Sequence, residues 1–504
     1  MRKIDPWLLV IVAIHAGVQL AFASFVPIYD GWKYAECVMD AAVTFSPSAL
    51  NCFGHPSIAY TGLLALPQFL FPGSAVAFGL VATLLGAVAV VAVHGILVRV
   101  LGPTRRTEIL LATACFAACP IVNANLTNPS PDAGVLVFFV LFLWALVSEH
   151  RRSALLCGVA LVFSKESGAV LYLLSLVLWL ALVEDRTGRS LRKLAVWSVP
   201  IFLLGGWYSA RYLGGAPALW SDPRGLAVGQ SLTLDVTKTY FRGFLVALFV
   251  IHFTWVASIL VVAGAVLRFR QWRNERLELF FFALLVSAVF FLTRYETYAH
   301  PRYVLAIYPL LVIVFAVATV RLFSSRRLQL TLGLFALLWA LSNFRTADPL
   351  SQSLYGTFPF GDHAMLKMTS IAQQRYGYGL DGLVYNFEFT HLDDLQSVLY
   401  AQVAPTPDTV LAVDYETNYQ LAPRLDSRTF ERTLRHTGSF EPLWMSVQDI
   451  EKLNGHLRDL WFVEIPTADT RASMAWLKAN YILAEERVAE RSGYRLRALH
   501  FVAP

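Results

Sequence analysis

Charged side chains are scarce in this sequence. Asp, Glu, Lys and Arg together make up 15 % of the 504 residues, whereas a soluble domain carries about 25 %. Hydrophobic residues make up 56 %, and the mean hydropathy is +0.54. These values exclude an ordinary soluble protein and indicate a chain that crosses a membrane many times.

The few charges are unevenly distributed. Lys and Arg outnumber Asp and Glu up to Phe344, and acidic residues are in excess after it. The formal net charge of +6 therefore does not point to nucleic acid, because the basic residues flank apolar segments, where they set membrane topology. The long apolar runs end at the same point, which predicts a transmembrane domain over residues 1–344 and an extracytoplasmic domain over 345–504.

A helix needs about 20 apolar residues to cross a bilayer. The first candidate follows Arg2 and Lys3 and also fits a cleaved signal peptide, but the apolar segments after it favour an uncleaved helix. Clear and short candidates together predict about eleven transmembrane helices, at 7–26, 74–98, 107–122, 132–148, 153–164, 168–183, 193–213, 241–267, 277–293, 302–320 and 328–344.

Basic residues gather in alternate loops. The positive-inside rule places the basic loops and the N-terminus in the cytoplasm, and the tail domain outside, which in a bacterium is the periplasmic side of the inner membrane. This assignment requires residues 153–183 to form a hairpin with Lys165 and Glu166 at its outer tip, and 57–70 to lie in the outer interface. The basic loops contain Arg2, Lys3, Arg99, Arg105, Arg106, Arg151, Arg152, Arg186, Arg189, Arg192, Lys193, Arg268, Arg270, Arg273, Arg276, Arg321, Arg326 and Arg327.

The first outer loop, residues 27–73, contains a candidate base. Asp30, Lys33 and Tyr34 are spaced to share one face of a helix. Asp30 directly follows the first span, where a base would meet a substrate whose lipid tail stays in the bilayer. A carboxylate stabilised by a helix N-terminus explains Asp30 as well. Cys37 and Cys52 in the same loop can form a disulfide outside the cytoplasm or stay as two free thiols.

Other ionisable residues lie in the next outer loops. His55, beside a proline, can bind phosphate, transfer a proton or ligate a metal, or it can simply occupy a turn. Asp132 opens an apolar helix and fits an N-cap. Lys165 and Glu166 can pair with each other, or Lys165 can hold a phosphate.

The last outer loop, residues 293–303, is rich in arginine and tyrosine. It contains Arg294, His300, Arg302 and Tyr303. Guanidinium groups suit phosphate because they donate two parallel hydrogen bonds. An aromatic belt at the membrane interface, with arginines that reach to the headgroups, is the alternative.

These motifs, in this order and on one side, resemble the GT-C glycosyltransferases, in the branch that includes protein O-mannosyltransferases and the lipid A aminoarabinose transferase. The resemblance covers about residues 1–320. Gly31 stands where many members have a second acid, Ser57 replaces a second proline, and Glu166 stands where glycine is usual. The motifs are Tyr29-Asp30 with Tyr34-Ala35, Gly54-His55-Pro56-Ser57 for a His-Pro-Pro or Lys-Pro-Pro element, Ser130-Pro131-Asp132-Ala133 for a Thr-Asp-Ala helix start, Phe163-Ser164-Lys165-Glu166 for a Thr-Lys-Gly tip, and His300-Pro301-Arg302-Tyr303 for a Pro-Arg-Tyr motif.

The resemblance implies a GT-C-like fold, interfacial helices in the first outer loop, and a membrane glycosyltransferase. A sugar would pass with inversion from a polyprenyl-phosphate donor to a hydroxyl of a lipid, glycan or protein, with Asp30 as general base. No cofactor is required, although His55 with Glu36 or Asp132 could hold a divalent metal. Substrate and phosphate contacts are expected from Tyr34, His55, Lys165, Arg294, His300, Arg302 and Tyr303, with Glu36, Asp132 and Glu166 as acidic partners.

Other functions also place a site at the outer face. One is a polymerase or ligase that uses a lipid-linked oligosaccharide, and another is a transporter or flippase of polyprenyl lipids. Transporters typically show internal repeats and charged or glycine-broken positions near the membrane midplane, and neither is clear here. A non-catalytic anchor for the tail would not need Asp30, His55 and Arg302 together.

The tail mixes the patterns of strands and helices. Their alternation predicts a small α/β domain that covers the outer cavity and helps to choose the acceptor. No glycine-rich nucleotide fingerprint and no cysteine–histidine cluster with metal spacing appears there. Strands are expected at 383–389, 409–413, 460–465 and 494–502, and helices at 391–402, 447–457 and 470–480.

Overall fold

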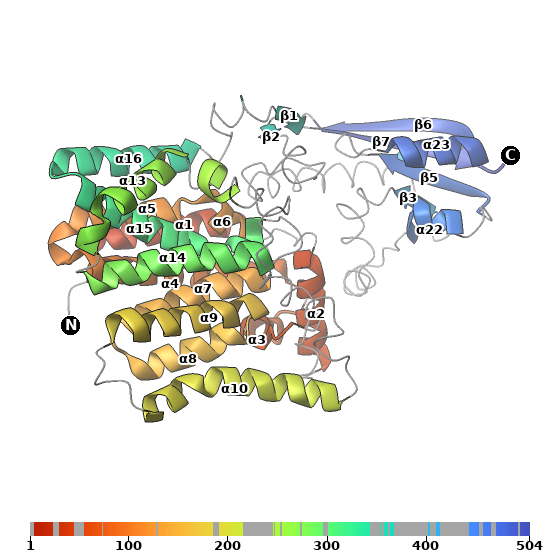
Figure 1. Ribbon diagram of the computed structural model, residues 1–504. Coiled ribbons are helices and arrows are strands. Elements are labelled where there is room, and N and C mark those ends of the chain that lie inside the picture. Colours follow the sequence, from red (N-terminus) through yellow and green to blue (C-terminus); the bar gives the residue numbers. More distant parts are fainter. Residues whose placement is uncertain are drawn as a thin grey trace.

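The computed structural model shows a bundle of helices and a separate small sheet (Figure 1). The bundle contains α1 (Pro6–Ala21), α2 (Asp30–Thr44), α3 (Ile58–Gln68), α4 (Ala75–Leu101), α5 (Arg106–Ala117), α6 (Pro120–Thr127), α7 (Pro131–Val147), α8 (Arg151–Val162), α9 (Glu166–Leu178), α10 (Leu191–Leu213), α13 (Trp255–Trp272), α14 (Arg276–Tyr295), α15 (Ile307–Leu322) and α16 (Arg326–Ser342). Short 3-10 or π-helical turns occupy Pro103–Arg105, Trp179–Val183, Ala247–His252 and Pro301–Val304.

The structure describes residues 5–23, 30–44, 55–72, 74–127, 130–184, 191–214, 245, 247–252, 255–272, 275–295, 301–342, 353, 357–360, 363–366, 402–403, 410–413, 443–452, 457–464, 470–491 and 494–504. Within some helices and strands the backbone alone is described. The predicted span at 241–267 is divided between a π-helical turn and α13, with residues 253 and 254 outside the described part.

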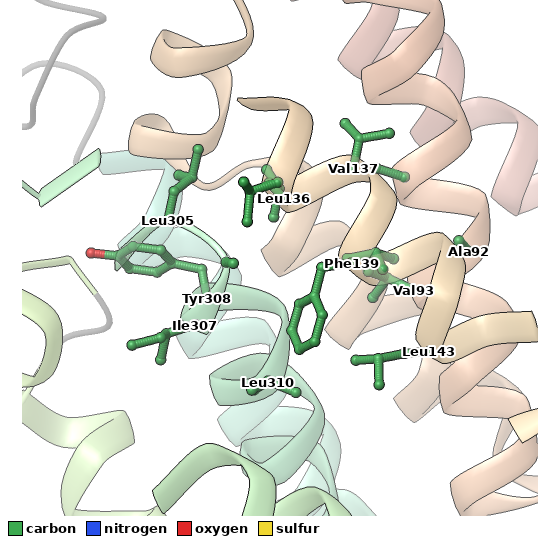
Figure 2. Packing of buried hydrophobic residues seen from close by; sticks show 14 of the residues in the cluster. Ala92, Val93, Leu136, Val137, Phe139, Leu143, Leu305, Ile307, Tyr308 and Leu310 are labelled. Carbon is green, nitrogen blue, oxygen red and sulfur yellow. The ribbon is translucent and has the colours of Figure 1, made fainter. Parts of the chain in front are cut away.

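The core of the bundle lies between α4, α7 and α15. Helix α7 is apolar all round and almost wholly buried, as expected for a helix surrounded by others. Phe139 and Leu143 of α7 face Val93 of α4 and Leu310 of α15 (Figure 2). These three helices therefore form the frame to which the outer-loop residues are attached.

The outside of the bundle is also apolar. Leu156, Phe202 and Val266 each expose more than 70 % of their surface, and such an apolar exterior is characteristic of a protein surrounded by lipid. In the described part of the chain, three helices are long and apolar enough to cross a membrane, Val76–Leu101, Glu166–Val183 and Arg276–Thr293, or four if the bent pair α5 and α6 forms one span. The count of eleven spans stays a prediction.

Two short segments have the predicted form. Residues 153–183 fold as two helices, α8 and α9, with Lys165 between them. Helix α3 has 11 residues, and at about 1.5 Å per residue it is too short to cross a bilayer. Tyr60 of α3 is fully buried against the bundle, where its ring touches Gly134 of α7 so closely that a Cβ on that glycine would lie 2.6 Å from the Tyr60 Cβ.

Basic residues from the predicted cytoplasmic loops meet at one end of the bundle. Arg106 donates to Asp5 at 2.5 and 2.8 Å, and these hydrogen bonds lower the pKa of Asp5 to about 2. Arg326 lies 3.5 Å from Glu108. Helices α2 and α3 lie at the opposite end, and the tail sheet lies beyond that same opposite end (Figure 1). One end of the bundle therefore carries loops predicted to be cytoplasmic, and the other end carries helices of the predicted outer loop.

The tail sheet has five strands in the order β4-β3-β5-β7-β6. Strand β3 runs parallel to β4 and β5, whereas β7 runs antiparallel to β5 and β6. A separate hairpin pairs β1 with β2. The elements are β1 (Thr357–Phe360), β2 (His363–Leu366), β3 (Val410–Val413), β4 (Leu443–Ser446), α22 (Val447–Lys452), β5 (Asp459–Glu464), α23 (Arg471–Asn480), β6 (Ile482–Arg491) and β7 (Tyr494–Val502).

The sheet confirms part of the tail prediction. Strands β3, β5 and β7 and helices α22 and α23 fall where the sequence places them. Strands β4 and β6 are absent from the prediction, and β6 is rich in charge because it lies at the edge of the sheet. The predicted strand at 383–389 and almost all of the helix at 391–402 lie outside the described residues.

A polar network supports the break between α5 and α6. Pro120 ends the helical hydrogen-bond ladder there, and the two helices meet at 50°. The Asn123 amide donates to the Ala117 and Cys119 carbonyls at 2.9 and 3.0 Å. Its oxygen accepts a 2.8 Å hydrogen bond from Gln19 of α1. Because lipid offers no water to an open carbonyl, these side chains hold the bend in place.

Replacing Asn123 with leucine should destabilise the bundle. The change removes the two hydrogen bonds that the Asn123 amide donates and the one that it accepts from Gln19, each worth about 1 kcal/mol. Asn125→Leu is the matched control, because that amide donates only to Ile121 of its own helix. Unfolding of the detergent-solubilised protein should show a clearly larger loss in the free energy of unfolding for Asn123→Leu than for Asn125→Leu. Equal losses would contradict the role of the network.

Candidate active site

A buried ion pair joins the start of α7 to the tip between α8 and α9. Lys165 Nζ donates to Asp132 Oδ1 at 2.9 Å, and each side chain exposes 7 % of its surface. Pro131 begins α7 and so fixes Asp132 in its first turn. The tip is tight, since a Cβ on Gly168 would collide with the Leu161 carbonyl. The fold therefore presents Lys165 to Asp132 from a rigid turn.

A second cation reaches the same carboxylate. Arg302, in the turn Pro301–Val304 before α15, places Nε 3.8 Å from Asp132 Oδ2. Its Nη2 donates to the Tyr303 hydroxyl at 3.2 Å. The Lys165 ammonium lies 4.3 Å from the centre of the Tyr303 ring, and the Arg302 guanidinium carbon lies 5.0 Å from it. Tyr303 therefore packs against both cations.

Among the described residues, Asp132, Lys165, Arg302 and Tyr303 form a group that we call the Asp132 cluster. Two cations and one carboxylate meet in it, in a mostly buried place. Charges are costly to bury unless they are paired and hydrogen-bonded. A phosphate that enters the cluster would accept hydrogen bonds from the lysine and the arginine.

Next to the Asp132 cluster lies a second group of polar residues. His55 Nδ1 and Glu166 Oε2 are 2.7 Å apart. The Tyr208 hydroxyl, from α10, donates to Glu166 Oε1 at 3.0 Å. The backbone also joins these segments, since the amide of Ala59 donates to the Phe163 carbonyl at 3.0 Å. The loop before α3 is thus attached to the hairpin tip.

The first outer loop is described in part. Helix α2 begins at Asp30, but the side chains of Asp30 and Glu36 lie outside the described residues. Tyr34 is buried. Cys37 is disulfide-bonded, which answers the choice between a disulfide and free thiols for this residue, and its predicted partner Cys52 lies outside the described part of the chain.

Two residues of the last outer loop lie outside the described part. Arg294 is in the last turn of α14, where the backbone alone is described. His300 is not among the described residues. The structure therefore brings together Asp132, Lys165, Arg302 and Tyr303, and it also brings together His55 and Glu166. The positions of the side chains of Asp30, Glu36, Arg294 and His300 stay predictions.

Two simple interpretations of the sequence prove wrong. Lys165 and Glu166 do not pair with each other, because Lys165 binds Asp132 and Glu166 binds His55. Asp132 is not the N-cap of α7, since Ser130 occupies that position. Asp132 as the partner of His55 in a metal site stays a prediction. Among the residues that the structure describes, no three His, Cys, Asp or Glu side chains are grouped as metal ligands.

Tyr208 has no counterpart among the predicted site residues. It lies in a long apolar segment with other aromatic residues, where tyrosine is typical of the membrane interface. No charge or motif beside it signals a contact with Glu166, because the two residues are brought together by the packing of α10 against α8.

The fold is found in known glycosyltransferases. Two crystal structures of ArnT from Cupriavidus metallidurans match over 98 % of this chain, one bound to undecaprenyl phosphate (TM-score 0.53, 14 % identity, 98 % of that chain) and one in the apo state (TM-score 0.55, 15 % identity, 97 % of that chain). The archaeal oligosaccharyltransferase AglB from Archaeoglobus fulgidus matches at a TM-score of 0.47, with 11 % identity over 97 % of this chain and 74 % of that one. No protein-family model and no curated protein sequence matches. The chain therefore shares the fold of the two ArnT structures, which agrees with the GT-C-like fold that the motifs imply.

The pair of Lys165 and Asp132 should be strongly coupled. Removal of one partner leaves a buried charge partly unpaired, so Lys165→Met and Asp132→Asn should each destabilise the protein by about 3 kcal/mol or more. The free energy of unfolding of the double variant should fall by less than the sum of the two single losses, with a coupling free energy of about 2 kcal/mol. Unfolding in detergent measures the four free energies of the cycle.

The pair of Arg106 and Asp5 is the control for this cycle. Arg106 is exposed, and exposed ion pairs contribute little because water screens them. The cycle of Arg106→Met and Asp5→Asn should therefore show a much smaller coupling. If the two cycles gave the same coupling, the Asp132 cluster would not be the low-dielectric site described above.

Proposed function

We propose that this protein is a membrane glycosyltransferase that takes a sugar from a polyprenyl-phosphate donor and attaches it to an acceptor hydroxyl at the outer face of the membrane. The observation that carries the proposal is the Asp132 cluster, in which Lys165 and Arg302 meet on one buried carboxylate. The shared fold gives it weight, since ArnT with this fold was crystallised with undecaprenyl phosphate.

The surroundings of the cluster suit a lipid phosphate. Two cations that can both donate to phosphate oxygens favour a phosphate at this point. Apolar side chains lie on the same outer part of the bundle, where Leu66 and Leu70, in and just after α3, are exposed. A polyprenyl chain could lie along such side chains in the bilayer while its phosphate enters the cluster.

The reaction is a single displacement. Asp30 takes the proton of the acceptor hydroxyl, whose oxygen attacks the anomeric carbon of the donor from the side opposite the phosphate. The bond between that carbon and the phosphate oxygen breaks, and its electron pair leaves with the polyprenyl phosphate. Lys165 and Arg302 neutralise the charge that develops on the phosphate. The anomeric configuration is therefore inverted.

Asp132 acts in this reaction through the cations. Its carboxylate holds Lys165 and Arg302 in fixed positions before the donor binds, so that little reorganisation is needed when negative charge develops on the phosphate. The two cations supply the charge that a metal ion would otherwise supply, so the proposed reaction requires no cofactor. A divalent metal shared by His55 and Glu36 stays a prediction, because the Glu36 side chain lies outside the described residues.

The proposal includes a topology and a role for the tail. The N-terminus is cytoplasmic, residues 1–344 form the catalytic domain in the inner membrane, and 345–504 form a periplasmic domain. The position of the tail sheet beyond the end where α2 and α3 lie supports this arrangement (Figure 1). A domain in that position can cover the site and help to select a lipid, glycan or protein acceptor.

The base assignment predicts the effect of Asp30→Asn. Loss of a general base should lower the transfer rate by about 10²–10⁴-fold, without loss of the folded protein. Asp40→Asn is the control, because Asp40 lies on the same helix about three turns further on and should leave the rate unchanged. The assay uses membranes that contain each variant and radiolabelled polyprenyl-phosphate sugars.

Two results would contradict the proposal in different ways. Full activity of Asp30→Asn would show that Asp30 is not the general base, while the proposed phosphate site would be unaffected by this result. No transfer from any polyprenyl monophosphate sugar would favour a polymerase or ligase with a lipid-linked oligosaccharide donor, or a flippase if the lipid crossed the membrane unchanged.

A further inference from the structure

Glu166 connects three parts of the chain that are distant in sequence. One carboxylate oxygen is 2.7 Å from His55 Nδ1, in the loop before α3, and the other accepts from the Tyr208 hydroxyl of α10 at 3.0 Å. Glu166 itself is the first residue of α9, where the helix dipole favours a carboxylate. His55 and Glu166 expose 17 % and 12 % of their side chains, so the contact is largely shielded from water.

The Glu166 carboxylate determines which nitrogen of the His55 ring can face a ligand. A carboxylate accepts hydrogen bonds, so Nδ1 must carry the proton that it shares with Glu166. The 2.7 Å separation is in the range of a charge-assisted bond between an imidazolium and a carboxylate. In the described part of the chain this is the one hydrogen bond of the ring. When the ring is an imidazolium, both of its nitrogens carry protons, and the opposite nitrogen, Nε2, is a donor that can meet a ligand.

Through Glu166, the His55 ring is attached to the hairpin tip that carries Lys165. Lys165 is the neighbour of Glu166 in sequence, and the amide of Ala59 binds the carbonyl of Phe163 at the same tip. The two oxygens of Glu166 have different partners, so a change in Tyr208 would let the carboxylate rotate and the ring with it. Tyr208 thus fixes Glu166, and Glu166 fixes His55.

We propose that Glu166 and Tyr208 are positioning residues that hold His55 so that its Nε2–H binds the phosphate of the polyprenyl donor beside Lys165. The inference rests on the proposed function and assigns roles to two residues that touch no substrate themselves. Glu166 keeps the ring in one orientation, and Tyr208 keeps the carboxylate in one orientation. This role explains why the Glu166 carboxylate lies near cations that would bind a phosphate. Glu166 acts on the phosphate through His55.

Binding of undecaprenyl phosphate, which carries no sugar, tests this directly. The full-length protein in detergent should bind the lipid, and Glu166→Gln should weaken the affinity about tenfold, with Tyr208→Phe weakening it about threefold. Tyr212→Phe is the matched control, because Tyr212 lies one turn further along α10 and exposes 61 % of its surface. It should bind as the wild type does. Thermal unfolding of each variant without lipid shows whether the fold is retained.

A second set of variants separates positioning from a structural role. In a His55→Ala background, Glu166→Gln and Tyr208→Phe should have no further effect on lipid affinity, because they act through the missing ring. Glu166→Asp, which keeps the carboxylate, should bind more tightly than Glu166→Gln. Additive losses in the His55→Ala background, or wild-type affinity for both single variants, would overturn the inference and leave the proposed function intact. Failure of the wild-type protein to bind the lipid would overturn both.

Discussion

The site depends on one carboxylate that is shared by two buried cations. Asp132 lies at the start of the most deeply buried helix, Lys165 comes from a tight hairpin tip, and Arg302 comes from the turn before α15. Apolar packing close to the charges fixes these positions, such as the contact between Tyr60 and Gly134 beside Asp132. The apolar frame therefore holds the charges in a place from which water is largely excluded, and where electrostatic interactions are strong.

Much of the fold follows from composition and charge. The apolar runs predict the helices, the basic loops predict which ends of the helices lie together, and Lys165 and Glu166 between two short runs predict the hairpin α8–α9. The motifs also predict the GT-C fold. These predictions succeed because a membrane allows few arrangements of a chain and imposes them over long segments.

The pairing of side chains could not be predicted in the same way. Asp132 and Lys165 are 33 residues apart, and Glu166 and Tyr208 are 42 apart, so their contacts depend on how α7, α8, α9 and α10 pack. One of the two interpretations of the sequence pairs Lys165 with its neighbour Glu166, because the sequence shows only that the two residues are adjacent. Strand β6 was missed for a related reason: an edge strand alternates less clearly between apolar and polar residues.

A structure with undecaprenyl phosphate bound tests the central claim most directly. The account predicts that a phosphate oxygen lies within hydrogen-bond distance of Lys165 Nζ and of the Arg302 guanidinium, with the Asp132 carboxylate still in contact with both side chains. A phosphate bound elsewhere, with Lys165 and Arg302 unchanged around Asp132, would contradict the account, because the ion cluster would then be a structural feature of the bundle alone.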